Sequence, residues 1–384
     1  RYFRESYEGL TLFGVPRSIR PSRRQLLGLL AWPILSPDDP PLDRAAEALL
    51  AEFRPDVVHL HQAGDFSASL LPRLRHAGIP VVMTLHDLSL MCLGGSKLRR
   101  YSLELCTQMP DCGVRCLESL VPIPRCPQHA MLRAAGRGFF WYTGLRRRAL
   151  ARALVARRDY LLRQLALVDR FIAPSQWLRE QYKAWGLDAA RIVHADYGTE
   201  LEPLAVGRGK TPSRVLRFGF LGRAMPDKGI HLLLEAFRQL NGAAELHLYT
   251  APPPNWPAYV RYLRDLAGRA KALFHSPVEP RRIAETFRGI DVLVVPSIWP
   301  ENSPLVIHEA FASGTPVIAA DAGGSRELVR PRRGGLLFRP ADADDLREVM
   351  RQLLNEPGLL DELRHTIPAI KSMREPAQEL ITLY

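Results

Sequence analysis

Residues 291–324, "DVLVVPSIWPENSPLVIHEAFASGTPVIAADAGG", predict a complete strand–helix–strand unit. Apolar, β-branched runs over residues 290–296 and 316–320 are typical of buried strands. The stretch between them has the length and the end signals of a helix over residues 304–313. Because strand, helix and strand in this order form the repeating unit of a parallel sheet, the stretch predicts an α/β fold.

The two ends of the predicted helix carry recognisable residues. Ser303 suits the N-cap, Pro304 suits the first helical position, and Gly314 suits the stop at the far end. In an open α/β sheet such a helix starts at the carboxyl end of the preceding strand, where ligands bind. Its free amides and its dipole attract an anion, most simply a phosphate.

Two glutamates bracket this anion site. Glu301 precedes the helix, and Glu309 lies about 9 Å beyond the cap along the axis, at ~1.5 Å per residue. Carboxylates only accept hydrogen bonds and therefore suit pairs of hydroxyls. We expect the sugar of a nucleotide-sugar at Glu301, its diphosphate at the helix start and its ribose at Glu309. The residues alone leave open the alternative that both glutamates are ordinary exposed charges.

A second anion site is predicted within residues 216–240, which have the pattern of a strand, a loop and a helix. Gly222 and Arg223 leave the strand, and Lys228 and Gly229 open the helix. Two cations beside a helix start can clamp a diphosphate without a metal. The spacing matches neither the nucleotide-binding phosphate loop nor the Gly-x-Gly-x-x-Gly dinucleotide fingerprint, which disfavours kinases and dehydrogenases.

The alternation of strands and helices continues through most of the chain. Strands are predicted at residues 56–62, 79–87, 169–175, 191–198, 215–221, 245–250, 272–275, 290–296, 316–320 and 335–338. Residues 203–214 are rich in Pro, Gly and basic side chains and predict a linker. We therefore expect two doubly wound domains, residues 1–202 and 215–371, with the ligand in the cleft between them. A carboxy-terminal helix at about residues 372–384 is expected to pack back on the first domain.

Composition agrees with a folded two-domain protein. The chain has 384 residues, of which 47% are hydrophobic and 24% charged. Its 52 Lys and Arg against 40 Asp and Glu give a formal charge of +12, which favours anionic partners. The longest apolar run, residues 26–35, contains Pro33 and is much shorter than the roughly 20 residues of a membrane-spanning helix. No transmembrane helix is predicted.

Five cysteines lie within residues 92–126. Their odd number argues against a closed set of disulfides. We expect reduced structural thiols. The alternative is a structural metal site, although the spacing matches no familiar zinc pattern. Its ligands would be Cys106, Cys112, Cys116 and Cys126.

Together these motifs resemble the retaining glycosyltransferases of family four. The matches are Gly222-Arg223 with Lys228-Gly229, then Glu301-Asn302-Ser303-Pro304-Leu305 with Glu309-Ala310, then "GTPVIAADAGGSREL" at residues 314–328. The resemblance extends over most of residues 55–384 and is most specific in the carboxy-terminal half. It implies the GT-B fold, in which two Rossmann-like domains face each other across a cleft. It also implies a metal-independent, hexosyltransferase-like activity in polysaccharide or glycoconjugate biosynthesis.

The resemblance assigns roles to individual residues. It implies diphosphate binding by Gly222, Arg223, Lys228, Ser303, Pro304 and Leu305, sugar binding by Glu301, Asn302 and Ser303, and ribose binding by Glu309. His86 matches the histidine that faces the donor sugar across the cleft, and is expected to be catalytic together with Glu301. His59 and His61 alternate on a strand and are interpreted as structural.

The implied ligands are small molecules. The donor is a nucleoside-diphosphate sugar of the UDP or GDP type, used without a further cofactor. The acceptor is a glycan, a lipid-linked sugar or a small molecule, and no nucleic acid is expected. In this family the leaving phosphate is thought to help deprotonate the acceptor on the same face of the sugar.

The start of the chain departs from the family pattern. Such proteins usually begin with a strand, a Gly-rich loop and a helix that contribute to the acceptor site. This chain opens with "RYFRESYEGLTLFGV", residues 1–15. We therefore expect an amino-terminal domain that lacks its first strand and helix.

A basic stretch lies within residues 129–170. Phe139, Phe140 and Trp141 precede arginines at helical spacing between Arg146 and Arg158. A solvated helix face explains the pattern, and a surface for anionic lipid or an acidic acceptor is the sharper interpretation. We expect a cytoplasmic protein, with peripheral binding to the inner face of the membrane as an extension.

Two other functions compete with glycosyl transfer. A basic module that binds acidic lipid or nucleic acid explains the charge of +12, but Glu301 and Glu309 beside the phosphate site would repel a polyanion. A sugar-nucleotide epimerase of the same fold is the other alternative. The paired catalytic carboxylates of such an epimerase are not recognisable in this sequence.

Overall fold

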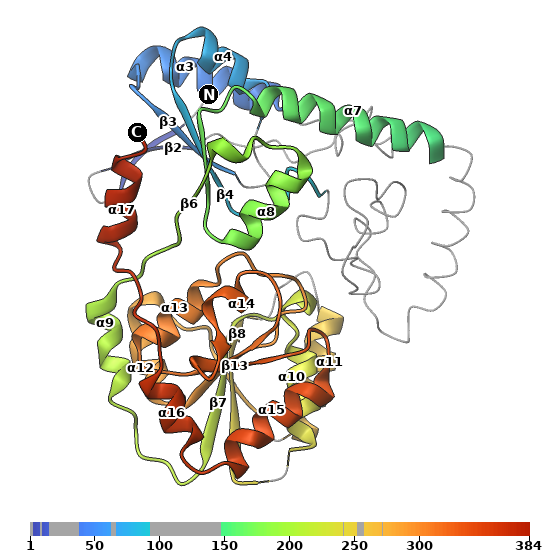
Figure 1. Cartoon of the computed structure of the whole chain (residues 1–384), viewed down its shortest axis with the longest axis vertical. Coiled ribbons are helices and arrows are strands. Elements are labelled where there is room, and N and C mark those ends of the chain that lie inside the picture. Colours follow the sequence, from blue (N-terminus) through green and yellow to red (C-terminus); the bar gives the residue numbers. More distant parts are fainter. Residues whose placement is uncertain are drawn as a thin grey trace.

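The structure is a computed structural model that describes residues 3–7, 10–14, 38–62, 67–92, 147–240, 242–251, 257–270 and 272–384. These residues form two α/β domains, which lie one above the other in Figure 1. Each domain is built on a parallel sheet with helices packed against it, as the sequence predicts.

The amino-terminal domain contains a four-stranded parallel sheet in the order β3-β4-β5-β6. Its strands are β3 (Val58–Gln62), β4 (Val81–Leu85), β5 (Arg170–Ala173) and β6 (Ile192–His194). Its helices are α3 (Pro40–Phe53), α4 (Leu70–His76), α7 (Arg147–Leu165) and α8 (Gln176–Trp185). A separate antiparallel hairpin, which the sequence did not predict, is formed by β1 (Phe3–Tyr7) and β2 (Leu10–Gly14).

Local sequence explains these elements. All five residues of β4 are buried, as expected for an inner strand covered on both faces. Helix α8 starts where the Ser175 hydroxyl accepts a hydrogen bond from the Leu178 amide, and it buries Tyr182 on the same face as Leu178. It ends at Gly186, whose φ of 119° is in the region that favours glycine.

The carboxy-terminal domain contains a seven-stranded parallel sheet in the order β12-β13-β11-β10-β7-β8-β9. Its strands are β7 (Leu216–Arg223), β8 (Ala244–Ala251), β9 (Leu273–His275), β10 (Val292–Val295), β11 (Val317–Ala320), β12 (Arg330–Pro331) and β13 (Gly334–Phe338). Its helices are α10 (Ile230–Arg238), α11 (Pro257–Ala270), α12 (Ile283–Arg288), α13 (Leu305–Ala312), α14 (Ser325–Leu328), α15 (Ala343–Asn355) and α16 (Leu359–His365).

The strand order of this sheet reverses beside β7. The chain first adds β8 and β9 on one side of β7 and then adds β10, β11 and β13 on the other. The carboxyl ends of β7 and β10 therefore form the switch point at which open α/β sheets bind ligands. Both predicted anion sites follow these two strands.

The chain crosses between the domains twice, and the two crossings are joined. The Thr199 amide donates to the Lys371 carbonyl, and the Met373 amide donates to the Thr199 carbonyl, each over 3.0 Å. Helix α17 (Arg374–Ile381) follows and lies beside the amino-terminal domain (Figure 1), where Leu380 and Leu383 pack against its sheet. The predicted linker, residues 203–214, includes the end of α9 (Leu201–Ala205) and a 3₁₀ turn that packs against α12.

One predicted helix boundary is wrong. Helix α13 covers Leu305–Ala312, and its N-cap is Pro304, which has extended backbone angles, rather than Ser303. The Ser303 hydroxyl donates instead to Asp196 of the other domain over 2.7 Å. The predicted stop is confirmed, because Gly314 has a φ of 65° directly after the helix.

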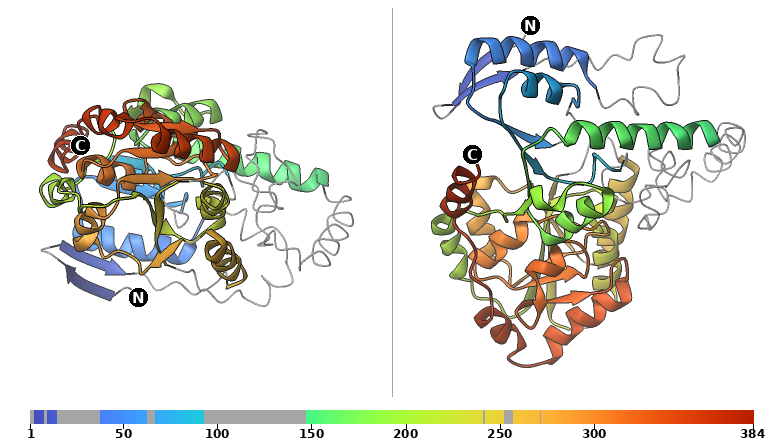
Figure 2. Two further views of the ribbon diagram at one scale, coloured as in Figure 1. Left: turned by 90° about the horizontal axis from the view of Figure 1, so that it is seen from below. Right: turned by 45° about the horizontal axis from the view of Figure 1, so that its top comes forward.

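The predicted basic helix face also needs correction. Helix α7 extends outward from the amino-terminal domain (Figure 2), but two of its arginines turn inward. Arg157 donates to the Leu90 carbonyl over 2.9 Å, and Arg158 donates to the Trp185 carbonyl over 3.1 Å. Burial lowers the pKa of Arg157. These two side chains stabilise the domain and do not contribute to a solvated basic face.

Several other predictions concern residues in or next to a stretch outside the described ranges. Phe139, Phe140, Trp141 and Arg146 lie outside the described residues, as do Cys106, Cys112, Cys116 and Cys126. Cys92 is buried and is a free thiol. Within the described ranges, no helix is both long and apolar enough to cross a bilayer.

Candidate active site

Three glycines hold the loop that carries Glu301. A Cβ on Gly229 would lie 1.9 Å from the Pro296 carbonyl oxygen, and one on Gly324 would lie 1.4 Å from the Asn302 carbonyl oxygen. Both distances are far below contact, so only glycine allows the loop to approach this closely. A Cβ on Gly323 would lie 2.3 Å from the Glu301 carbonyl oxygen, and the Gly324 amide donates to that carbonyl over 2.7 Å. The Gly-Gly pair thus fixes the backbone on which the site is built.

The predicted sugar-binding and diphosphate-binding side chains are in direct contact. Glu301 is buried, and its Oε1 accepts hydrogen bonds from Lys228 Nζ and from Ser297 Oγ, both at 2.6 Å. Lys228 also lies over the Trp299 ring, 5.4 Å from its centroid. Both contacts engage Oε1 of Glu301. Its Oε2 has no hydrogen bond within the described parts of the chain and can accept one from a hydroxyl group.

Arg223 supplies positive charge near the loop that carries Glu301. It is exposed at the end of β7, and among the described residues its side chain has no hydrogen bond or ion pair. Asp227, which the sequence reasoning missed, lies in the 3₁₀ turn before α10. Burial raises the pKa of this carboxyl, although Lys228 acts in the opposite direction. Within the described residues, an anion at this loop would meet Arg223 without an ion-pair partner and Lys228 already paired with Glu301.

Asn302 joins the two domains. Its Oδ1 accepts from Ser175 Oγ over 2.7 Å, and its Nδ2 donates to the His86 carbonyl over 3.1 Å. The side chain is therefore occupied in this conformation, so any contact of Asn302 with a sugar would fall to its backbone. Glu327 makes a second link, because its carboxylate accepts from the Gln176 amide over 2.9 Å and from the Trp177 amide at the start of α8. Asn302 and Glu327 thus connect the two domains through hydrogen bonds along this edge.

Ser303 belongs to a small polar cluster that the sequence reasoning did not find. Its hydroxyl contacts His308 Nε2 at 2.9 Å and Asp196 Oδ1 at 2.7 Å. His308 is 2% exposed, and burial lowers its pKa although Asp196 opposes the shift. Pro304 is buried beside them, whereas the Leu305 side chain is 52% exposed. Any contact of Leu305 with a phosphate therefore falls to its backbone.

His86 lies within a chain of rings at the end of β4. Its Nδ1 contacts the Tyr197 hydroxyl and its Nε2 contacts His61 Nδ1, each at 2.9 Å. Burial and the neighbouring His61 lower the pKa of His86, so the ring is neutral at pH 7. A neutral imidazole has one donor and one acceptor nitrogen, so these neighbours fix its tautomer.

The interpretation of His61 as purely structural is incomplete. His61 stacks between His59 and His86, with centroid distances of 4.3 and 5.2 Å. His59 in turn contacts Thr84 Oγ1 at 2.7 Å and the Tyr384 hydroxyl at 2.5 Å. Burial, with the two other histidines, lowers the pKa of His59 to about 4. Alternation on a strand could have indicated His61, because it puts His61 and His59 on one face.

Glu309 is available for a ligand. It lies in the second turn of α13, and its carboxylate has no hydrogen bond or ion pair among the described residues. Burial raises its pKa to about 7. A half-buried carboxylate without a partner among the described residues carries a desolvation cost, and hydroxyl donors from a ligand would relieve that cost.

No resident metal centre is indicated in the parts of the chain that the structure describes. They contain no group of three or more His, Cys, Asp or Glu residues arranged to hold a metal ion. The cationic groups near the cleft loop are Arg223 and Lys228, which can neutralise a diphosphate without a metal.

Comparisons with known proteins identify the family of the chain. The family model of glycosyl transferases group 1 matches residues 208–370, and that of the glycosyl transferase 4-like domain matches residues 1–198. A D-inositol 3-phosphate glycosyltransferase of Geodermatophilus obscurus is 33% identical over 215 residues, which are 51% of this chain and 48% of that protein. The enzyme of the same name from Stackebrandtia nassauensis is 36% identical over 209 residues, which are 50% and 46%. The chain spans about half the length of the curated relatives it matches.

Solved structures share the fold. Sucrose-phosphate synthase from Thermosynechococcus elongatus superposes with a TM-score of 0.68 at 21% identity, covering 100% of this chain and 84% of that one. Anabaena HepE, solved with UDP and glucose, gives a TM-score of 0.61 at 17% identity, covering 89% and 80%. The two sheets facing each other across a cleft are thus a GT-B fold. With one family model matching each half, the chain belongs to the GT-B glycosyltransferases of family four.

Proposed function

We propose that the chain transfers a sugar, with retention of configuration, from a nucleoside-diphosphate sugar to an acceptor hydroxyl. The observation that carries the proposal is the meeting of the two domains at one point. The His86 carbonyl of the amino-terminal domain accepts from Asn302 Nδ2, directly beside Glu301 of the other domain. This arrangement suits a reaction in which one domain holds the donor and the other presents the acceptor.

The donor is assigned to groups that remain available in the structure. Arg223 has no hydrogen bond or ion pair within the described ranges of the chain, and it would bind the diphosphate with Lys228, Gly222 and the start of α13. The second oxygen of Glu301 would accept hydrogen bonds from the sugar hydroxyls. Glu309, with a pKa raised to about 7, would accept hydrogen bonds from the ribose. With a diphosphate bound, Lys228 would donate hydrogen bonds to both the phosphate and Glu301.

The chemical step needs no protein nucleophile. The bond between the sugar anomeric carbon and the diphosphate oxygen breaks while the acceptor oxygen bonds to that carbon on the same face. The acceptor proton passes to the departing diphosphate, so the products are a glycoside and a nucleoside diphosphate. Arg223, Lys228 and the amides at the start of α13 stabilise the charge that develops on the leaving group. Neutral His86 would position a hydroxyl group of the donor sugar during transfer.

The identity of the base and the acceptor are finer proposals. We place UDP before GDP because a neighbour with the same fold was solved with UDP and glucose. Inositol 3-phosphate is the first small acceptor to test because the curated relatives carry that name. Glycans and lipid-linked sugars follow. The epimerase and the non-catalytic anion-binding alternatives have no support from the comparisons.

The proposal also includes a cytoplasmic location with peripheral binding to the inner membrane face. The charge of +12 supports attraction to anionic lipid. The inward orientation of Arg157 and Arg158 removes two of the cations on which it was based. Equal binding to anionic and neutral vesicles at low salt would eliminate this part and leave the enzymatic proposal intact.

The direct test is a screen of nucleotide-sugars for release of nucleoside diphosphate, with and without acceptors. We expect release from at least one UDP- or GDP-sugar, a product with the anomeric configuration of the donor, and no loss of rate with EDTA. An inverted product or a requirement for a divalent ion would contradict the proposed step. Absence of both binding and turnover across the screen would contradict the function itself.

A further inference from the structure

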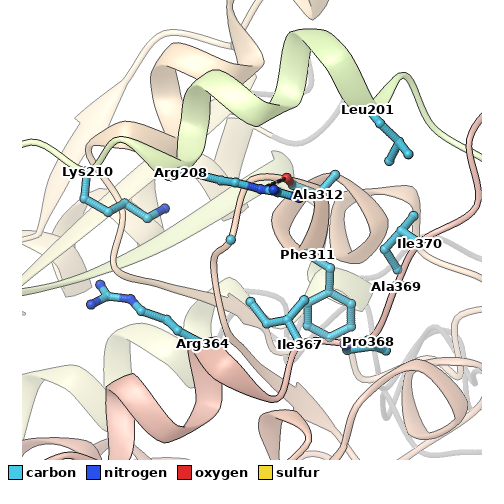
Figure 3. Close-up of a pocket in the computed structure, with 11 residues that line it drawn as sticks. Leu201, Arg208, Lys210, Phe311, Ala312, Arg364, Ile367, Pro368, Ala369 and Ile370 are labelled. Carbon is cyan, nitrogen blue, oxygen red and sulfur yellow. Dashed lines mark hydrogen bonds between the residues drawn. The ribbon is translucent and has the colours of Figure 1, made fainter.

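A cavity of about 640 Å³ lies at the far end of α13 from the Glu301 loop. One wall is apolar and is formed by Leu201, Phe311, Ile367 and Ile370. The opposite wall is cationic and is formed by Arg208, Lys210 and Arg364, as Figure 3 shows. The volume lies within the range of about 300–1,000 Å³ that small-molecule sites occupy. None of the residues assigned to the donor lines this cavity.

The three cations are held mainly by neutral groups. Arg208 Nε donates to the Ala312 carbonyl over 3.2 Å, and the rest of the side chain is exposed. Lys210 Nζ donates to the Phe287 carbonyl over 2.8 Å and to Thr315 Oγ1 over 2.5 Å. No carboxylate forms an ion pair with either side chain among the described residues. Their charges are therefore available to an anion.

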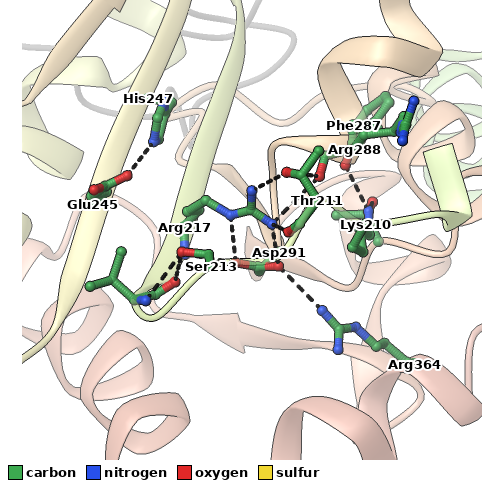
Figure 4. Close-up of polar contacts among 12 residues, drawn as sticks. Lys210, Thr211, Ser213, Arg217, Glu245, His247, Phe287, Arg288, Asp291 and Arg364 are labelled. Carbon is green, nitrogen blue, oxygen red and sulfur yellow. Dashed lines mark hydrogen bonds and ion pairs between the residues drawn. The ribbon is translucent and has the colours of Figure 1, made fainter.

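Positive charge exceeds negative charge around the cavity. Behind its wall, Arg217 forms a buried ion pair with Asp291 over 3.0 Å. Arg364 approaches the same Asp291 at 3.4 Å (Figure 4). It also pairs with Asp361 at 3.1 Å. Of these side chains, the cations Arg208, Lys210, Arg217 and Arg364 outnumber the carboxylates Asp291 and Asp361, which leaves the group with a net charge of +2 when Lys210 is protonated. Glu245 exerts a further electrostatic effect on Arg217.

The protonation of Lys210 reflects this excess. The pKa of Lys210 is lowered to about 7, mainly by burial and also by the nearby charges of Arg364 and Arg217, while Asp291 opposes the shift. A bound anion would offset this repulsion and favour the charged form. The Nε of Arg364 is also buried without a hydrogen-bond acceptor among the described residues. Both observations favour the binding of an anion at the cationic wall.

We propose that this cavity is a second ligand site, which binds a phosphate monoester with an apolar body. A phosphate monoester carries a charge of about −1.5 to −2 at pH 7, which matches the net charge of the wall better than a carboxylate does. Guanidinium groups such as Arg208 and Arg364 bind phosphate oxygens in pairs. The apolar body would lie against Phe311 and Ile367 on the opposite wall.

The position of the cavity gives such a ligand a structural effect. Arg208 and Lys210 follow the first crossing between the domains, and Ile367 and Ile370 belong to the second. The two crossings are hydrogen-bonded to each other at Thr199. A ligand that contacts both would hold them together and bias the relative position of the domains. By linkage, it would change donor affinity and donor binding would change its own affinity by the same factor.

The test uses the 384-residue protein and hexyl phosphate, titrated by calorimetry at pH 7. We expect saturable binding that is weaker for methyl phosphate, because methyl phosphate lacks the apolar body, and that persists in the presence of saturating UDP. Arg208→Glu should weaken binding about tenfold or more. Arg282→Glu is the matched control, because Arg282 is 70% exposed on a neighbouring turn outside the cavity, and it should leave binding unchanged.

Three results would overturn the proposal: no binding of hexyl phosphate, displacement of hexyl phosphate by UDP, or equal weakening by both variants. Circular dichroism would confirm that Arg208→Glu is folded, and Arg208→Gln gives a milder change of the same sign. The binding claim is independent of glycosyl transfer. Hexyl phosphate that binds while no nucleotide-sugar does would sustain this site and contradict only the proposed function.

A second arm distinguishes a free metabolite from a membrane lipid. Vesicles of phosphatidylcholine with phosphatidic acid are compared with vesicles that carry the same charge as phosphatidylserine. Retention selective for phosphatidic acid and lost in Arg208→Glu would assign the site to a lipid with a phosphate monoester head group. Equal retention on both vesicles, together with binding of hexyl phosphate, would assign it to a free phosphate monoester.

Discussion

The two halves of the candidate active site are held in place by different means. In the carboxy-terminal domain, the loop of Glu301 and Asn302 is fixed by backbone contacts that Gly229, Gly323 and Gly324 make possible. In the amino-terminal domain, His86 is oriented by the side chains of His61 and Tyr197. The glycine contacts form a backbone lock, which is rigid and independent of protonation. The hydrogen bonds among His61, His86 and Tyr197 instead depend on the tautomers of the two histidines. We therefore expect donor binding to be sensitive to added bulk and turnover to be sensitive to lost hydroxyls.

The largest effect is expected from Gly324→Ala. Its Cβ would lie 1.4 Å from the Asn302 carbonyl oxygen, so the loop must move. We expect a loss of about 3 kcal/mol of stability and of most donor affinity, measured by denaturant unfolding and calorimetry. Gly268→Ala is the control, because nothing lies within 4 Å of its added Cβ in helix α11, and it should be neutral or stabilising by up to about 1 kcal/mol. Similar losses in both variants would refute the backbone lock.

The next effect concerns Arg223, a cation at the end of β7 that has no ion pair among the residues the structure describes. Arg223→Ala should weaken nucleoside diphosphate binding roughly tenfold or more, since charge-assisted hydrogen bonds contribute about 1.5–3 kcal/mol. EDTA should not change binding in either protein. Arg282→Ala removes an exposed arginine elsewhere and serves as the control. Full affinity in Arg223→Ala would move the diphosphate away from β7.

Glu309 predicts a pH dependence on the donor side. Its folded-state pKa is raised from 4.5 to about 7, so the carboxyl is mostly protonated at pH 6 and mostly ionised at pH 8. A ribose that needs the carboxylate should bind about tenfold more tightly at pH 8 than at pH 6. The probe is a nucleotide-sugar, because its diphosphate diester does not titrate in this range.

Glu309→Gln should remove most of this pH dependence and lower affinity at pH 8. A pH profile that the substitution leaves unchanged would exclude Glu309 from the donor site. The same raised pKa has a consequence for the free protein. The contribution of Glu309 to stability is fully present below about pH 4.5 and is lost as the pH rises through about 7.

The smallest effect is expected on the amino-terminal side. Tyr197→Phe removes the hydroxyl that contacts His86 Nδ1 at 2.9 Å and keeps the ring. A neutral hydrogen bond contributes about 0.5–1.5 kcal/mol, so kcat should fall about two- to tenfold while donor affinity is unchanged. The pH profile of kcat should shift because the tautomer of His86 is no longer fixed. An effect on donor affinity alone would place Tyr197 in the donor site.

The sequence predicted the parts of the molecule that depend on near neighbours. The strand predicted at residues 316–320 is β11 (Val317–Ala320), because a short apolar run between turn residues determines it. The cleft loop was predicted because Glu301 to Leu305 match a family motif. The sequence did not predict Pro304 as the N-cap of α13, because the Ser303 hydroxyl donates instead to Asp196, more than a hundred residues away. Long-range partners of this kind leave no local pattern.

The same reason explains the other corrections. Arg157 and Arg158 have helical spacing that suits an exposed face, yet the carbonyls of Leu90 and Trp185 lie within their reach. His61 became part of the site only when β3 and β4 paired in register, with His61 beside Thr84. The cationic cavity combines a crossing at Arg208 with another at Ile367, so only the fold brings its walls together.

The central claim is that donor binding belongs to one domain and turnover needs both. It is tested most directly by measuring nucleotide-sugar affinity and turnover together in the unaltered protein, in Glu309→Gln and in His86→Ala. We predict that Glu309→Gln loses both affinity and turnover, whereas His86→Ala keeps donor affinity within about threefold, well under the tenfold that 1.4 kcal/mol represents, and loses turnover. Undiminished turnover in His86→Ala, or donor binding that depends on His86 and not on Glu309, would contradict the account.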